Sequence, residues 1–153
     1  MVRVALAQMN VIPGRPNKNL ETMLRMIEEA KKGGADLVAF PEMAVGGYIL
    51  GDKWLDESFC ANLMSFNEPL RKASEVHEIA VAYGNVYVED PSRKAGFHPN
   101  KDGRLRKYNA VYVFQNGKPS KRKHDLGILP EGIQPKTLLP NYRFFDDERY
   151  LRI

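Results

Sequence analysis

One carboxylate follows a stretch that is typical of a buried β-strand. Residues 35–40 form a nearly all-apolar hexamer, the pattern of a strand covered on both faces, and Pro41 ends it abruptly. Glu42 is therefore expected at the carboxyl end of that strand, where α/β sheets bind their ligands. A carboxylate held there can serve as a general base. The alternative is that Glu42 is an ordinary polar residue of a turn.

A second candidate is the lysine in the segment 135–150. This segment combines Lys136 with two prolines, four aromatic residues and three adjacent acids. Aromatic side chains around a lysine can exclude water and hold its ammonium as a fixed donor, the kind of group that stabilises an oxyanion. The alternative is that Lys136 forms a salt bridge with one of the acids at 146–148 at the start of a helix.

The single cysteine, Cys60, is expected to be structural. It lies in a helix-like stretch between Phe59 and Ala61 rather than at the end of a strand, and a free cysteine in such a place is usually a small buried hydrophobic residue. One cysteine cannot form an intramolecular disulfide, so the sequence does not require an oxidising compartment.

Other chemical signals in the chain are weak. Gly46 and Gly51 have the spacing of a phosphate loop, but Asp52 occupies the position of the required lysine. The three histidines are far apart and lack metal-ligand spacing, so no metal site is predicted. Basic and aromatic residues at 104–123 could bind single-stranded nucleic acid. Acids interrupt this patch, so a solvated hairpin is favoured and no nucleic-acid partner is predicted.

A β-α-β unit is expected to position Glu42. Alternating apolar residues predict a strand through residues 2–6. A helix is expected next, capped by Asn17 or Asn19 and stopped by the glycine pair at 33–34. The strand at 35–40 then completes the unit, with a right-handed crossover.

Alternating helices and strands are expected downstream. We predict helices at 54–64 and 69–78 and strands at 79–83, 86–88 and 108–114. Gly84 is expected to bend the chain between the first two of these strands. Residues 90–103 have the composition of a loop, and 118–134 form an irregular excursion of the kind that is often functional.

Size and composition favour one globular unit. The chain has 153 residues, 43% of them hydrophobic, which is sufficient for one core. A formal charge of +4 is weak evidence for a polyanionic partner. No apolar run approaches the roughly 18 residues that a membrane span needs, and the N-terminus does not resemble a signal peptide. A cytoplasmic protein without a membrane partner is therefore expected.

Several of these segments match sequence motifs of a known enzyme family. The runs VALAQMN at 4–10 and GADLVAFPE at 34–42 resemble the N-terminal signature of the carbon-nitrogen hydrolases of the nitrilase superfamily. Within it, the runs GGY at 46–48, KTLLPNY at 136–142 and FDDERY at 145–150 are similar to the glutaminase domain of glutamine-dependent NAD synthetases. The resemblance spans nearly the whole chain.

The resemblance implies a fold and a site. The family fold is an α-β-β-α sandwich, and residues 1–153 are expected to form the N-terminal half of this hydrolase domain. The family uses a Glu-Lys-Cys triad, so Glu42 is implied as the general base and Lys136 as the residue that polarises the substrate carbonyl. The nucleophilic cysteine belongs to a later strand-to-turn elbow, beyond this chain. Tyr48 and Tyr142 match positions that line the glutamine pocket or its ammonia exit in the synthetases, and Asp147 falls where many members have a second glutamate.

The implied reaction is hydrolysis of the glutamine side-chain amide to glutamate and ammonia. No cofactor is implied for this step, and a synthetase domain that this chain lacks would use ATP and magnesium to amidate deaminated NAD. The family also implies a homo-oligomer. The alternatives are that the chain derives from another small-amide hydrolase of the nitrilase type, or that it is a truncated product without activity. Lys123, in the run KHDL at 123–126, imitates the lysine motif, but only Lys136 has the LPNY and FDD sequel.

Overall fold

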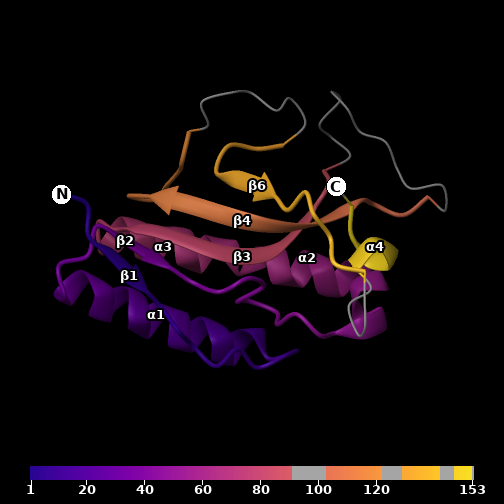
Figure 1. Ribbon diagram of the computed structural model, residues 1–153, viewed down its shortest axis with the longest axis horizontal. Coiled ribbons are helices and arrows are strands. Elements are labelled where there is room, and N and C mark those ends of the chain that lie inside the picture. Colours follow the sequence, from indigo (N-terminus) through magenta and orange to yellow (C-terminus); the bar gives the residue numbers. More distant parts are fainter. Residues whose placement is uncertain (91–102, 122–128, 142–146, 153) are drawn as a thin grey trace.

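The computed structural model describes residues 1–90, 103–121, 129–141 and 147–152. They form one mixed β-sheet with helices packed on one of its faces (Figure 1). The elements in chain order are β1 (Val4–Leu6), α1 (Pro16–Lys32), β2 (Leu37–Ala39), η1 (Gly51–Leu55), α2 (Glu57–Ser65), α3 (Asn67–Val76), β3 (Ala80–Val88), β4 (Lys107–Gln115), β5 (Lys118–Pro119), β6 (Ile133–Pro135) and α4 (Asp147–Tyr150).

The sheet has the strand order β1-β2-β3-β4-β5, with β6 also paired to β4. Strands β1, β2 and β3 are parallel, whereas β4 runs antiparallel to β3 and to both of its short neighbours. The β-α-β unit expected from residues 2–40 is therefore present. Helix α1 packs on β2 and α3, α2 packs on β3, and α3 packs on β3 and β4.

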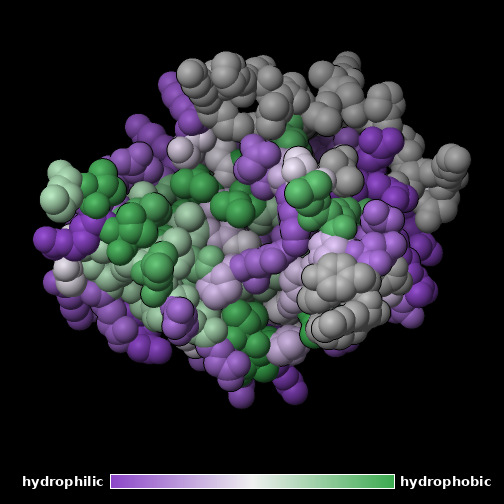
Figure 2. Space-filling model, viewed as in Figure 1, coloured by the Kyte–Doolittle hydropathy of each residue, from purple (hydrophilic) through white to green (hydrophobic). Residues whose placement is uncertain are grey.

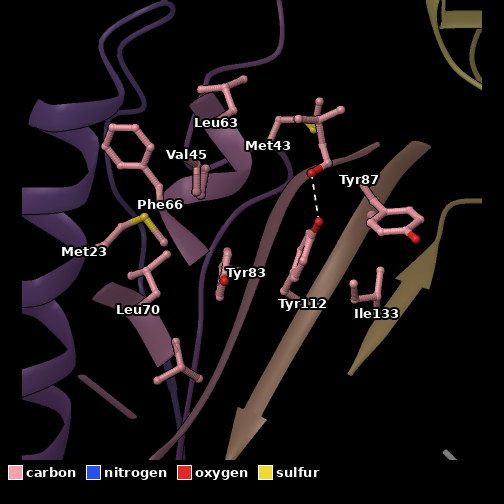
Figure 3. Close-up of a cluster of buried hydrophobic side chains, with 14 of the residues drawn as sticks. Met23, Met43, Val45, Leu63, Phe66, Leu70, Tyr83, Tyr87, Tyr112 and Ile133 are labelled. Atoms are coloured by element: carbon pink, nitrogen blue, oxygen red, sulfur yellow. Dashed lines mark hydrogen bonds between the residues drawn. The ribbon is translucent and has the colours of Figure 1, made fainter. Parts of the chain in front are cut away.

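The core lies between the sheet and these helices (Figure 3). Met23 and Ile27 of α1, Leu63 of α2 and Leu70 of α3 are fully buried there. Burial of a side chain of this size stabilises a fold by about 1.5–3 kcal/mol. Tyr83 stacks on Tyr112 across β3 and β4, with ring centres 5.5 Å apart.

The opposite face of the sheet is apolar and open. Residues in register across a sheet share one face, and one such row comprises Leu6, Ala39, Ala82 and Val113. On β1, Val4 and Leu6 keep 48% and 76% of their surface exposed. Figure 2 shows hydrophobic side chains gathered over this part of the molecule.

Two local predictions were wrong. The N-cap of α1 is Arg15, which makes no side-chain capping bond, and Pro16 occupies the first turn. The side chain of Asn19 instead bonds to the backbone of Ile12 and to the carbonyl of Val45, so it joins two loops. The predicted bend at Gly84 is also absent, because β3 continues through that residue.

The other expected elements are close to their predicted positions. The helix expected at 54–64 is divided into η1 and α2, and the next helix begins at Asn67 rather than at Pro69. The excursion at 118–134 contributes β5 and most of β6, while residues 122–128 lie outside the described ranges. No helix in the described part of the chain is long and apolar enough to cross a membrane.

Candidate active site

Glu42 lies just beyond the carboxyl end of β2, where the chain turns over β3. The amide of Phe40 donates to the carbonyl of Ala82 at 2.8 Å, and the amide of Gly84 donates to the carbonyl of Pro41 at 3.2 Å. A Cβ on Gly84 would collide with the backbone nitrogen of Met43 and would lie 2.8 Å from the Cα of Glu42. Glycine is therefore required for the backbone that carries Glu42 to approach the strand.

Lys136 reaches Glu42 from a segment 94 residues away. It directly follows β6, and its amide donates to the carbonyl of Asn109 on β4 at 2.7 Å. Its Nζ lies 2.7 Å from Oε1 of Glu42, and the two side chains are 31% and 45% exposed. Lys136 therefore forms its ion pair in the described part of the chain with Glu42 rather than with the acids near residue 147.

Asn109 is a third member of this cluster, which the sequence-based prediction missed. It is 3% exposed, and its Nδ2 donates to Oε1 of Glu42 at 2.5 Å. The orientation of its amide follows from chemistry, because an ionised carboxylate can only accept. The available signal was a polar residue between Tyr108 and Ala110 in the otherwise apolar run 108–114.

Tyr48 and Asp147 lie beside the ion pair. The hydroxyl of Tyr48 donates to Oδ2 of Asp147 at 2.5 Å, and Nζ of Lys136 lies 5.7 Å from the centre of the Tyr48 ring. That separation allows a cation-π interaction. Two of the three implied substrate-binding residues, Tyr48 and Asp147, thus lie near the pair formed by Lys136 and Glu42. Tyr142 and the alternative lysine, Lys123, lie outside the described residues.

Helix α4, which carries Asp147, is tied to η1. The hydroxyl of Tyr150 donates to Oδ1 of Asp52 at 3.0 Å, and the guanidinium of Arg149 lies 3.3 Å from the same oxygen. The carbonyl of Tyr48 accepts a hydrogen bond from the Trp54 indole at 3.3 Å. These contacts join the segment that carries Tyr48 to helix α4, which carries Asp147.

A cavity of about 480 Å³ opens at this cluster. Its polar lining includes Glu42, Asn109 and Lys136, and its apolar lining includes Ala82 and Val111 from the open face of the sheet. The cavity is large enough for a small organic ligand. The described residues contain no group of three or more His, Cys, Asp or Glu side chains arranged to hold a metal ion.

Cys60 lies away from this cavity and is fully buried in α2. Its Sγ donates to the carbonyl of Trp54 at 3.6 Å. Burial raises the pKa of the Cys60 thiol to about 11. Cys60 is therefore a buried residue of a helix, as its sequence context predicted, and a buried thiol with a raised pKa is a poor nucleophile.

The burial of Cys60 predicts slow alkylation. At pH 8, iodoacetamide should modify the folded chain about 100-fold more slowly than the urea-unfolded chain, because the raised pKa of the buried thiol lowers its thiolate fraction by about that factor. Mass spectrometry of timed samples measures both rates. A chain with Cys60→Ala and the exposed substitution Ser58→Cys provides the control and should react at the rate of a free thiol. Equal rates for folded and unfolded Cys60 would contradict the assignment.

Comparisons with known proteins agree on one class. The sequence model named carbon-nitrogen hydrolase matches residues 3–144. The fold resembles an amidase of the nitrilase superfamily from Nesterenkonia sp. AN1, with 18% identity, a TM-score of 0.69, and coverage of 99% of this chain and 47% of the amidase. The predicted α/β fold of nitrilase type is therefore confirmed. The chain belongs to the carbon-nitrogen hydrolase family.

Within that family, the similar curated proteins are glutamine-dependent NAD(+) synthetases. The one from Acinetobacter baylyi is 30% identical over 148 residues, which cover 97% of this chain and 22% of the relative. The one from Aquifex aeolicus is 28% identical over 152 residues, which cover 99% of this chain and 22% of the relative. The solved structure of the glutamine-dependent NAD+ synthetase from Acinetobacter baumannii in complex with ADP is 31% identical, with a TM-score of 0.67. The match covers 97% of this chain and 23% of the synthetase chain. The chain thus spans about a fifth of the length of these relatives.

Proposed function

We propose that residues 1–153 supply the base and the carbonyl-polarising lysine of a cysteine-dependent amidase that hydrolyses glutamine. The observation that carries the proposal is the 2.7 Å contact between Nζ of Lys136 and Oε1 of Glu42 at the mouth of a cavity. The single cysteine of the chain, Cys60, is buried elsewhere. The nucleophile is therefore assigned to polypeptide outside these residues.

The proposed reaction has two stages. Glu42 accepts the thiol proton, the cysteine sulfur attacks the amide carbon, and the ammonium of Lys136 donates to the oxygen of the tetrahedral intermediate. The carbon-nitrogen bond breaks, and the proton held by Glu42 leaves with ammonia. Water, deprotonated by Glu42, then attacks the thioester, which releases glutamate and the thiol. No cofactor takes part in these steps.

The open face of the sheet is the proposed place for the cysteine-bearing polypeptide. The cavity is continuous with this face through Ala82 and Val111, and exposed Val4 and Leu6 extend its apolar surface. A second sheet stacked about 10 Å away would cover these residues and bring a strand end to the cavity. The isolated chain is therefore expected to be inactive. Homo-oligomer formation and a cytoplasmic location stay predictions.

Glutamine is the favoured substrate because of the relatives and because of the polar side chains beside Lys136. The relatives from Acinetobacter baylyi and Aquifex aeolicus are glutamine-dependent NAD(+) synthetases. Tyr48, with its hydroxyl on Asp147, lies beside Lys136, where it can contact the polar end of an amino acid. In a full synthetase, the ammonia would pass to a domain that uses ATP and magnesium. Hydrolysis of another small amide is the alternative.

A chimera tests the substrate. Residues 1–153 replace the matching segment of the Acinetobacter baylyi synthetase, which supplies the downstream part, and ammonia release is measured with glutamine and with butyramide. We expect glutamine to be hydrolysed with the higher kcat/KM, by at least about tenfold, because the polar end of glutamine finds partners that butyramide cannot use. The unmodified synthetase is the control. A preference for butyramide in the chimera alone would favour the small-amide alternative.

A further inference from the structure

We infer that Asn109 is a positioning residue, which fixes the orientation of the Glu42 carboxylate in the proposed active site. Its consequence for the reaction rests on the proposed function. The positioning itself is a property of the folded chain and can be tested without catalysis.

The sheet register places Asn109 at the point where the two candidate catalytic residues meet. Asn109 lies opposite Val86 in the β3-β4 pairing, and Val111, two residues further along β4, lines the same cavity. Its backbone carbonyl accepts the amide of Lys136 at 2.7 Å, while its side chain donates to Glu42. One residue therefore connects the chain segments that carry both Glu42 and Lys136.

The geometry at Glu42 explains why a second donor matters. Nδ2 of Asn109 and Nζ of Lys136 both bind Oε1, at 2.5 Å and 2.7 Å. Within the described ranges, Oε2 accepts no hydrogen bond, so this oxygen is left to take a proton. Lysine has a long flexible stem, whereas Asn109 has a short side chain, is 3% exposed and lies on a paired strand. Displacement of a catalytic group by about 1 Å can cost on the order of 100-fold in rate.

A neighbouring asparagine shows what a purely structural role looks like. Asn85, on β3, is 1% exposed, and its Nδ2 donates to the carbonyl of Leu63 at 2.8 Å and to Oδ1 of Asn67 at 3.0 Å. These partners belong to α2 and α3, so Asn85 joins the sheet to its helices. Asn109 differs because its side-chain partner is a half-exposed carboxylate at the cavity.

Nuclear magnetic resonance of the labelled 153-residue chain tests the inference. Correlations transmitted through hydrogen bonds should connect the side-chain nitrogens of Lys136 and Asn109 to the carboxyl carbon of Glu42. With Asn109→Leu, we expect the correlation between Lys136 and Glu42 to be lost, because the carboxylate is free to rotate. The matched control Asn85→Leu should lower the urea midpoint of unfolding and keep that correlation.

Two results would overturn the inference: a Lys136–Glu42 correlation that persists with Asn109→Leu, or one that Asn85→Leu removes equally. If Asn109→Leu does not fold, Asn109→Ser is measured in its place. It should also lose the Lys136–Glu42 correlation, since the serine side chain is too short for its hydroxyl to reach Glu42. No cysteine or glutamine enters the experiment. Failure of the chimera to release ammonia would therefore count against the proposed function and leave the role of Asn109 standing.

Discussion

Lys136→Ala in the chimera is expected to lower kcat for ammonia release from glutamine by at least about 10²–10³-fold, the cost of removing one preorganised oxyanion donor. Nζ of Lys136 lies 2.7 Å from Glu42 at the cavity, so its loss removes a donor and also leaves the base without its cation. A coupled assay for ammonia, with glutamine at saturation, measures kcat.

Two further lysine variants sharpen this prediction. Lys118→Ala, at an exposed position of β5, changes the charge of the chain equally and should leave kcat within about twofold, as for surface substitutions away from a site. Lys123→Ala tests the alternative lysine of the sequence and should also have little effect. Retention of more than a tenth of the activity by Lys136→Ala, with a large loss for Lys123→Ala, would reverse the assignment.

Gly84→Ala should destabilise the isolated chain by about 3 kcal/mol, because the added methyl group has no room to relax. It would meet the backbone of Met43 and Glu42 rather than a flexible side chain. The same displacement should move Glu42 away from Lys136, so the chimera should also lose activity. Urea unfolding followed by circular dichroism measures the free energy change.

Gly33→Ala is the matched control for Gly84→Ala. Gly33 caps α1 with a φ of −75°, and a Cβ there comes no closer than 3.4 Å to another heavy atom. Its substitution should change the free energy of unfolding by less than about 1 kcal/mol. Equal effects of the two substitutions would show that the close approach of Glu42 to β3 is not needed for the fold.

Local sequence patterns predicted the frame of the site and the position of Glu42. The apolar run at 35–40 and the break at Pro41 are features of neighbouring residues, and they were sufficient to place Glu42 at a strand end, as the structure has it. The family of the chain was likewise predicted from its motifs.

Features that depend on contacts distant in sequence were missed. Asn109 contacts Glu42 only because β4 pairs with β3 in one register and the loop after β2 passes over β3. The residue type of Gly84 suggested a bend in the strand. The structure instead requires glycine there because the backbone of residues 42 and 43 passes close to it. Asn19 suggested a helix cap, whereas two loops use its side chain. Propensity carries no information about such tertiary partners.

Ammonia release from glutamine, measured side by side for the isolated 153-residue chain and for the chimera, tests the central proposal most directly. Glu42 and Lys136 lie together at a cavity, and Cys60 is buried away from it. We therefore predict release by the chimera and none by the isolated chain. Release by the isolated chain would contradict the account, because a nucleophile within residues 1–153 would then have to act.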